Sequence, residues 1–227
     1  WSPITEKAED IEACRKMTFD AGEEPIGGTS WWLDPICLGR YPDTTGYSYE
    51  AYIPDTTAED MKIISQPIDF IGMNVYQTYR GKAGENGTCI TIPNDPGYAR
   101  TNAEWPVTPE ALYWGPKFYE ERYHKKLYIT ENGLSNQDWI FLDGQVHDLQ
   151  RIDFLHRYLY QLKRAVEEGI SVEGYFHWTL TDNFEWTSGY NNRFGLVYTD
   201  FKNQNRIIKD SGKWYRQVIE TNGEIIK

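Results

Sequence analysis

The sequence has few cysteines, no long hydrophobic run and no internal repeat. Only three of its 227 residues are cysteines (Cys14, Cys37 and Cys89), an odd number without the spacing of a metal site. This composition favours reduced thiols in a cytoplasmic protein over a disulfide framework. No apolar stretch approaches the roughly eighteen residues of a membrane span, and we expect no signal peptide. Lys, Arg and His form no cluster that suggests a phosphate or metal site, and we expect no metal and no cofactor.

Positive charge is also scarce. The chain has 23 Lys and Arg residues against 34 Asp and Glu residues, a formal net charge of -11. This balance argues against nucleic acid or an anionic membrane surface as a partner. Aromatic residues, by contrast, make up 15% of the chain, with nine Trp and seventeen Tyr. The apolar face of a pyranose stacks on aromatic rings, so this excess favours sugar recognition, although a tryptophan-rich core would explain it equally well.

Apolar patterning predicts alternating helices and strands. Three short apolar runs have the pattern of strands buried on both faces of a sheet. The longest predicted helix carries Ile152, Leu155, Leu159, Leu162 and Val166 at alternating steps of three and four, the stripe of a helix laid against a sheet. This order of elements predicts parallel βα units of a barrel or a doubly wound sheet. The expected elements are strands at 67–74, 126–133 and 171–178, helices at 5–19, 56–65, 109–122, 148–168 and 211–220, a hairpin at 197–209, a small surface strand at 88–92 and a long loop at 31–52.

Polar and aromatic residues follow all three predicted strands. Asn74 and Tyr76 lie beyond the first strand and Glu131 ends the second. The third leads through Trp178 into a loop with Asp182, Asn183, Glu185 and Trp186. Because parallel strands bring their carboxyl ends to one face, these groups would form a cup for a neutral, polyhydroxylated ligand. Alternatively, Glu131 only caps the next helix and Glu185 is a solvated loop charge.

One hexapeptide carries a resemblance to a known family. Residues 128–133, Tyr-Ile-Thr-Glu-Asn-Gly, resemble the nucleophile motif of the family 1 glycoside hydrolases, the β-glucosidases and their relatives. Residues 69–76 resemble the sixth barrel strand of this family and residues 174–186 the eighth. The resemblance implies the carboxyl-terminal part of a (β/α)8 TIM barrel, from the end of strand 5 through helix 8, as a single domain over 1–227. Further similar stretches are 31–35, 39–42, 193–198 and 213–215.

The resemblance implies hydrolysis of β-glycosides with retention. Glu131 would attack the anomeric carbon to form a glycosyl-enzyme, and a second Glu about 5 Å away would protonate the leaving oxygen and later activate water. Tyr76 matches the phenol that bonds the nucleophile, which favours the ionised carboxylate. Asn74 matches a residue near the acid/base pair.

The same comparison implies residues for substrate binding. Glu185 and Trp186 would hold sugar hydroxyls, Trp178 would lie beneath the ring, Phe194 would close the wall, and Trp105 would line the aglycone side. Trp178 and Phe194 could instead be plain barrel core. Relatives that act on 6-phosphoglycosides are similar to one another in placing a Ser and a Lys in the loop that holds Glu185 here. The loop of this chain therefore favours an unphosphorylated β-glucoside or oligosaccharide as substrate.

The chain departs from the family in what it lacks. The acid/base Glu of the family lies in a Thr-x-Asn-Glu-Pro motif on the fourth strand, and no such motif occurs here. Three strands cannot close a barrel, and their edges would stay open. The chain also opens at Trp1 without an initiator Met, so we expect a piece of a longer protein, completed by an amino-terminal barrel fragment or chain.

Two hypotheses from different classes follow. The first is the nucleophile half of a retaining β-glucosidase, active when joined to its missing part. The second is a catalytically incomplete fragment that at most binds carbohydrate. A nucleotide-binding doubly wound domain is disfavoured, because no Gly-rich phosphate loop follows a strand.

Overall fold

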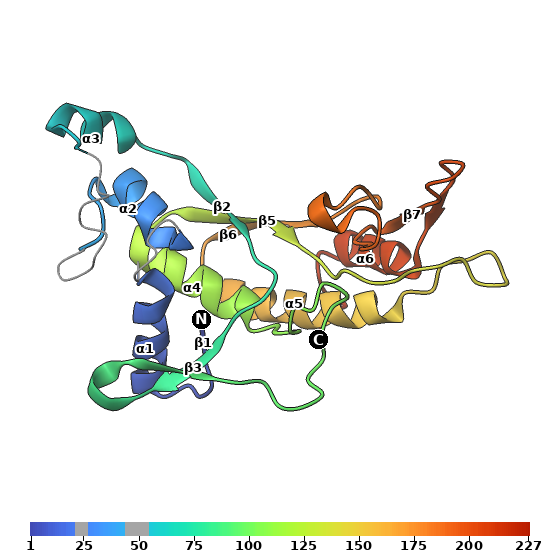
Figure 1. Ribbon diagram of the computed structural model, residues 1–227, viewed down its shortest axis with the longest axis horizontal. Coiled ribbons are helices and arrows are strands. Elements are labelled where there is room, and N and C mark those ends of the chain that lie inside the picture. Colours follow the sequence, from blue (N-terminus) through green and yellow to red (C-terminus); the bar gives the residue numbers. More distant parts are fainter. Residues whose placement is uncertain (21–26, 44–54) are drawn as a thin grey trace. The chain divides into compact units, whose positions relative to one another are not determined.

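The computed structural model describes residues 1–20, 27–43 and 55–227 (Figure 1). They fall into two compact units. The first comprises Trp1–Ile71, Tyr79–Ile92 and Phe118–Lys125, and the second comprises Gly72–Thr78, Pro93–Lys117 and Lys126–Lys227. The single domain expected over 1–227 stays a prediction.

The first unit is built from helices and a small mixed sheet. In this sheet β1 pairs with β3 in parallel, and β3 pairs with β4 in the antiparallel direction. Thr57 begins α3 with a capping box, in which its side chain accepts from the Asp60 backbone and the Asp60 carboxylate accepts from the Thr57 backbone. This confirms the predicted start of that helix. The elements are β1 (Ser2–Pro3), α1 (Ala8–Phe19), α2 (Thr29–Leu38), α3 (Ala58–Ile64), β3 (Arg80–Ala83), the 3-10 helix η3 (Glu85–Gly87) and β4 (Cys89–Ile92).

The helix α2 corrects the loop predicted for residues 31–52. It occupies Thr29–Leu38 and ends at Gly39, whose φ of 68° is the left-handed geometry that glycine adopts easily. The buried face of α2 carries Ser30 and Asp34 besides apolar groups, and Pro35 lies inside the helix. Polar residues on the buried face and an internal proline hide the apolar period that marks most helices. Residues 44–52 lie outside the described part of the chain.

The second unit is organised around a three-stranded sheet in the order β2-β5-β6, with β5 and β6 parallel. Of the hairpin strands, β7 and β8 pair in the antiparallel direction. Both β2 and α4 include residues of the first unit. The elements are β2 (Phe70–Asn74), α4 (Ala111–Tyr123), β5 (Lys126–Asn132), α5 (Leu149–Glu167), β6 (Val172–His177), the 3-10 helix η4 (Trp186–Ser188), β7 (Val197–Thr199), β8 (Arg206–Ile208) and α6 (Asp210–Glu220).

The sheet has one buried face rather than two. In β5, Leu127 and Ile129 are fully buried, whereas Thr130 is exposed. In β6, Phe176 is 58% exposed. The expectation of burial on both faces is therefore wrong for this chain, because nothing within the described residues covers the second face. A strand sequence suited to two buried faces thus leaves apolar surface open.

The helix α5 packs against the buried side with a face different in part from the predicted one. Leu159 and Leu162 line the same groove as Val172 and Tyr175, which puts α5 beside β6. Val166, expected within the buried stripe, is 46% exposed. The buried face keeps the helical steps of three and four but also includes residues that are not aliphatic; its members are Arg151, Phe154, Leu155, Tyr158, Leu159, Leu162 and Ala165.

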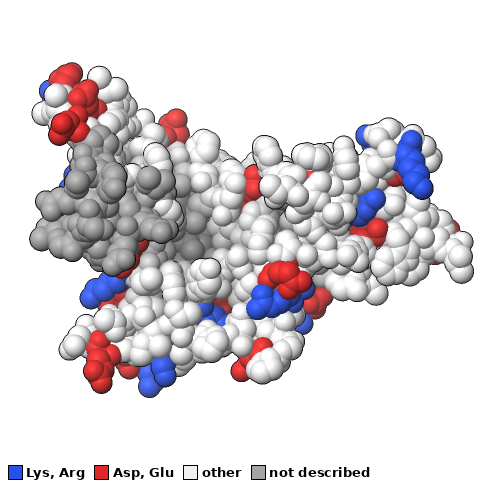
Figure 2. Space-filling model, viewed as in Figure 1, with Lys and Arg blue, Asp and Glu red and all other residues white. Residues whose placement is uncertain are grey.

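Three features of the described residues bear on partners and ligands. None of the helices within the described ranges is both long and apolar enough to cross a membrane. On the face shown in Figure 2, Lys and Arg side chains are interspersed with Asp and Glu side chains. Residues 1–20, 27–43 and 55–227 contain no group of three His, Cys, Asp or Glu side chains that could hold a metal ion.

Candidate active site

The ends of β2 and β5 bring Tyr76 and Glu131 together. The Val75 backbone N–H donates to the Glu131 carbonyl over 2.9 Å, so the two strand ends lie side by side. Tyr76 follows Val75 directly, and the Tyr76 hydroxyl donates to Oε2 of Glu131 over 2.8 Å. Two residues that sequence analysis assigned to one site thus form a direct hydrogen bond. Glu131 is held on a strand, which fixes the direction of its carboxylate.

Tyr76 is fixed on its other sides as well. Its ring lies 5.0 Å from the Trp105 ring and 6.2 Å from the Phe194 ring, between centroids. Its backbone carbonyl accepts from the Tyr158 hydroxyl over 3.0 Å. Burial, the hydrogen bond to Glu131 and the charge of that carboxylate raise the pKa of Tyr76 well above its ordinary value. The phenol therefore stays protonated and can only donate to Glu131.

Phe194 and Trp105 are placed as a wall behind Tyr76. Phe194 is only 3% exposed, and its ring centroid lies 6.2 Å from that of Trp105. Phe194 and Trp105, two of the four aromatic residues predicted to bind substrate, therefore both lie beside Tyr76. Their contact with a sugar stays a prediction.

Trp178 joins the end of β6 to the site. Its backbone N–H donates to the Asn132 carbonyl over 2.9 Å. Its indole Nε1 donates to Oε2 of Glu185 over 3.3 Å. Burial and the charge of Glu131 raise the pKa of Glu185, against the hydrogen bond from Trp178, which lowers it. The negative charge of Glu131 thus disfavours the ionised form of Glu185.

Two predicted residues lie at the margin. Asn74 is exposed, and its side-chain oxygen accepts from the Thr130 hydroxyl over 2.7 Å on the open face of the sheet. Trp186 is 78% exposed and begins η4 with a φ of 45°. The roles predicted for both residues stay predictions.

Asn132 is a supporting residue that sequence analysis missed. It is fully buried, and its side-chain nitrogen donates to the Val75 carbonyl over 2.8 Å. Its side-chain oxygen accepts from the Tyr175 hydroxyl over 2.8 Å. One amide thereby connects β5 to Tyr175 of β6 and to Val75, the residue that follows β2. A register shift between Ile129 and Asn132 breaks the alternation of side chains along β5, so the sequence period gave no signal for this buried amide.

A buried ionic network supports the loops around the site. Asp138 accepts from Arg151 over 2.8 Å and from Lys209 over 2.5 Å, and all three side chains are fully buried. Arg151 also pairs with Asp148. Burial acts to raise the pKa of Asp138, but Arg151 and Lys209 outweigh it and hold that pKa below its usual value.

Asp182 belongs to this network and not to the rim where sequence analysis placed it. It is 4% exposed, and it accepts from Lys209 over 2.8 Å and from Arg193 over 2.6 Å. The Gly195 backbone N–H donates to it over 2.9 Å. Asp182 therefore stabilises the loop that carries Glu185. Of these two carboxylates, Glu185 is the one that accepts from Trp178.

The comparisons with known proteins agree with this geometry. Residues 2–224 match glycosyl hydrolase family 1, and the chain belongs to this family. It is 40% identical over 224 residues to a 1,4-beta-D-glucan glucohydrolase of Thermotoga neapolitana, covering 98% of this chain and 49% of that protein. It is 35% identical over 246 residues to a 6-phospho-beta-galactosidase of Clostridium acetobutylicum, covering 95% of this chain and 50% of that protein.

A solved structure gives the same picture for the fold. The beta-glucosidase from Thermotoga maritima in complex with glucoimidazole matches with a TM-score of 0.80 and 39% identity, covering 98% of this chain and 49% of that one. The predicted fold is confirmed as part of an α/β barrel. The chain spans about half the length of the curated relatives that it matches.

Proposed function

We propose that this chain supplies the nucleophile half of a retaining β-glycoside hydrolase of the β-glucosidase type. The observation that carries the proposal is the 2.8 Å hydrogen bond from Tyr76 to Glu131 at the ends of two neighbouring strands. Glu131 attacks the anomeric carbon and the bond to the leaving oxygen breaks, which leaves a covalent glycosyl-enzyme. Water then cleaves this ester and the anomeric configuration is retained overall.

The Tyr76 phenol acts on the charge of the nucleophile. Its hydrogen bond stabilises the ionised carboxylate that must attack, and it keeps one oxygen engaged while the other faces the sugar. Trp178 and Glu185 are placed to bind the ring and its hydroxyl groups. Trp105 and Phe194 support Tyr76 and extend the apolar wall toward the leaving group. Asn74 and Trp186 lie at the edge of the site, where Asn74 is near the acid/base pair and Trp186 holds sugar hydroxyls.

An unphosphorylated sugar fits the charges around Glu185 best. Family relatives include a protein named as a 6-phospho-beta-galactosidase, so membership alone does not choose the substrate. Lys209 and Arg193 both pair with Asp182 of this loop. A phosphate dianion would meet two carboxylates, Glu131 and Glu185, without a cation committed to it. A neutral glucoside meets donors and acceptors that match its hydroxyls.

A further segment must supply the acid/base catalyst. The 227 residues contain no Thr-x-Asn-Glu-Pro motif, and the chain spans 49% of its relative from Thermotoga neapolitana. Among the described strands, β2 and β6 each keep one edge without a neighbour. The open face of the sheet carries Thr130 and the exposed Phe176. We infer that an amino-terminal segment or chain covers this face and brings the second Glu, in a protein of the cytoplasm.

Hydrolysis tests the proposal when the chain is measured alone and together with the amino-terminal half of a family 1 β-glucosidase. We expect cleavage of 4-nitrophenyl β-glucoside in the mixture only, with the β anomer appearing first by proton NMR. A 6-phosphorylated analogue should react far more slowly. An α anomer as the first product, or preference for the phosphorylated analogue, would contradict the assignment.

The alternative function is carbohydrate binding without catalysis. It is favoured by the missing acid/base motif. A chain of this kind would bind glucose or cellobiose as a stable monomer and would gain no hydrolysis from the added amino-terminal half. The same mixing experiment therefore separates the two functions.

A further inference from the structure

Two cysteines distant in sequence meet in the first unit. Cys14 lies on α1 and Cys89 is the first residue of β4. Their Sγ atoms are 3.8 Å apart, although 75 residues separate them along the chain. Neither cysteine is in a disulfide. The third, Cys37, lies on the separate helix α2.

Gly81 makes this approach possible. It lies in β3, between Pro3 of β1 and Thr91 of β4. A Cβ atom at this position would lie 2.6 Å from the Cys89 sulfur and 2.8 Å from the Cys14 sulfur. Both distances are too short for any side chain. The two thiols therefore occupy the space that a side chain at position 81 would fill.

We propose that Cys14 and Cys89 form a reversible disulfide when the protein meets a peroxide. A disulfide bond is about 2.05 Å long, so the sulfurs must approach one another further, by rotation of flexible Cys side chains. The bond would tie α1 to the hairpin of β3 and β4. It involves none of the residues assigned to glycoside hydrolysis, so this inference stands apart from the proposed function.

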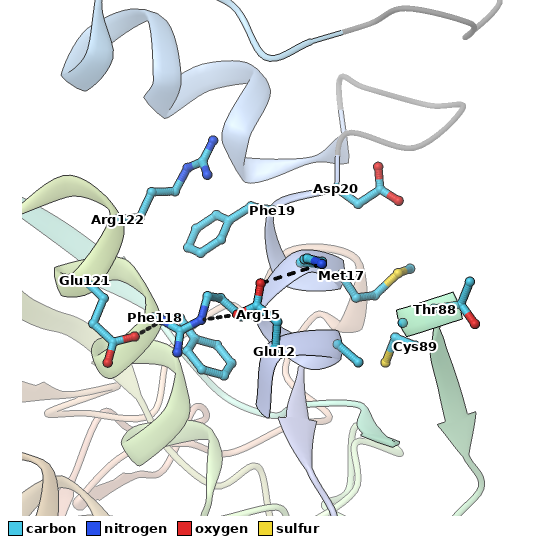
Figure 3. Close-up of a pocket in the computed structure, with 13 residues that line it drawn as sticks. Glu12, Arg15, Met17, Phe19, Asp20, Thr88, Cys89, Phe118, Glu121 and Arg122 are labelled. Atoms are coloured by element: carbon cyan, nitrogen blue, oxygen red, sulfur yellow. Dashed lines mark hydrogen bonds and ion pairs between the residues drawn. The ribbon is translucent and has the colours of Figure 1, made fainter. Parts of the chain in front are cut away.

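A peroxide can reach Cys89 from a cavity. This cavity has a volume of about 700 Å³ and is lined by residues of α1, η3, β4 and α4 (Figure 3). Cys89 is part of the lining and is half-buried, whereas Cys14 is fully buried. Burial and the neighbouring Cys89 raise the pKa of Cys14 to about 12, so its thiolate is scarce. The order of reaction follows, with Cys89 oxidised first.

The chemistry balances with one peroxide. The Cys89 sulfur attacks a peroxide oxygen, the O–O bond breaks, and a sulfenic acid and one water result. The Cys14 sulfur then attacks the Cys89 sulfur, the S–O bond breaks and the oxygen leaves as a second water. Two thiols are oxidised by two electrons and the peroxide is reduced. A thiol such as dithiothreitol reverses the step.

Peptide mapping tests the pairing on the full chain. The folded protein is treated with hydrogen peroxide, the remaining thiols are alkylated in denaturant, and the chain is cut with trypsin. The three cysteines fall into separate peptides, residues 8–15, 17–40 and 83–100. We expect peptides 8–15 and 83–100 to be joined, the intact mass to fall by about 2 Da, and dithiothreitol to reverse both changes.

Variants and a denatured sample give the controls. Cys37→Ser should keep the 2 Da loss. Cys89→Ser should abolish it and leave Cys14 open to alkylation. Oxidation in denaturant should give all three pairings, because no fold then selects one. Folded protein that leaves Cys14 and Cys89 unlinked, or that pairs Cys37 with either of them, would overturn the proposal.

Thermal unfolding provides a second readout. A disulfide that closes a loop of this length should raise the midpoint by about 5–15 °C on oxidation, and dithiothreitol should remove the rise. The same treatment of Cys89→Ser should leave the midpoint where it was. An equal rise in Cys89→Ser would also contradict a bridge between these two residues.

Discussion

The Tyr76 hydroxyl donates a hydrogen bond of 2.8 Å to the Glu131 carboxylate across 55 residues of sequence. The bond joins the carboxyl ends of β2 and β5, where the Val75 N–H donates to the Glu131 carbonyl over 2.9 Å. Main-chain and side-chain bonds therefore agree on one arrangement. Glu131 therefore has a committed hydrogen-bond donor, which stabilises the ionised carboxylate that its proposed role as nucleophile needs.

Replacement of Tyr76 by Phe removes this donor and keeps the ring. A hydrogen bond to a charged group contributes about 1.5–3 kcal/mol, so labelling of Glu131 by an activated fluoro-glucoside should slow by about 10- to 100-fold. The matched control is Tyr160→Phe, because Tyr160 is 45% exposed on α5. An unchanged rate in Tyr76→Phe would show that the bond does not act on the nucleophile.

Replacement of a buried aspartate and of an exposed aspartate by asparagine should lower the free energy of unfolding by very different amounts. Asp138→Asn leaves Arg151 and Lys209 buried with less opposing charge, which should lower the free energy of unfolding by about 3–5 kcal/mol. Asp153→Asn breaks a pair with Arg157 whose side chains are 62% and 61% exposed, and should change it by about 0.5 kcal/mol or less. Urea unfolding of both variants measures the contrast, and equal effects would contradict a structural role for Asp138.

His177 predicts how stability falls in acid. Burial, with the positive charges of Arg151 and Lys209, lowers the pKa of His177 to about 3. Between about pH 6.5 and about pH 3, His177 is protonated in the unfolded chain but neutral in the folded chain. The free energy of unfolding should therefore fall by at most about 1.4 kcal/mol per pH unit as the pH drops from about 6.5 toward about 3. His177→Gln should flatten this slope in urea titrations between pH 7 and pH 5.

His147 serves as a control, because its replacement should change the pH dependence of stability in the opposite direction. Hydrogen bonds to Asp210 and Asp143 raise the pKa of this exposed histidine. Its contribution is present at low pH and is lost as the pH rises through its folded pKa. His147→Gln should therefore steepen the loss of stability in acid. If both variants changed the slope in the same direction, the assignment of His177 would be wrong.

Sequence patterns predicted those site residues that a short stretch of neighbouring sequence marks. Glu131 and Tyr76 each follow an apolar run, and such runs are read from neighbouring residues. The third apolar run led in the same way to Trp178 and Glu185, which the structure joins by a hydrogen bond, whereas Phe194 and Trp105 came from the family resemblance alone. Apart from α2 and the short strands β1 and β3, the order of the main strands and helices was predictable for the same reason.

The network around Asp138 was not predictable from sequence. Its partners Arg151 and Lys209 lie 13 and 71 residues away, and charged residues usually lie at the surface. For this reason Asp182 was expected at the rim, beside Glu185. The open face of the sheet was missed because apolar strand patterns predict burial but not what provides it.

The glycine of the nucleophile motif has a steric reason to be there. A Cβ atom on Gly133 would lie 1.9 Å from the Trp178 carbonyl oxygen. Gly133→Ala should therefore displace the Trp178 backbone and lower the free energy of unfolding by about 1–3 kcal/mol, measured by urea unfolding. Gly27→Ala, whose Cβ position has no atom of the described residues within 4 Å apart from its chain neighbours, should change it by about 0.5 kcal/mol or less. Equal stability of the two variants would contradict this close approach.

Covalent trapping tests whether Glu131 is the nucleophile. The chain, joined by an amino-terminal half that completes the barrel, is incubated with a 2-deoxy-2-fluoro-glucoside that carries an activated leaving group. Such a probe needs little help from a general acid and stalls at the glycosyl-enzyme. We predict one fluoroglucosyl group on Glu131, within the tryptic peptide of residues 127–151, and none in Glu131→Gln. A folded, completed barrel that stays unlabelled, or that carries the label on another residue, would contradict the assignment.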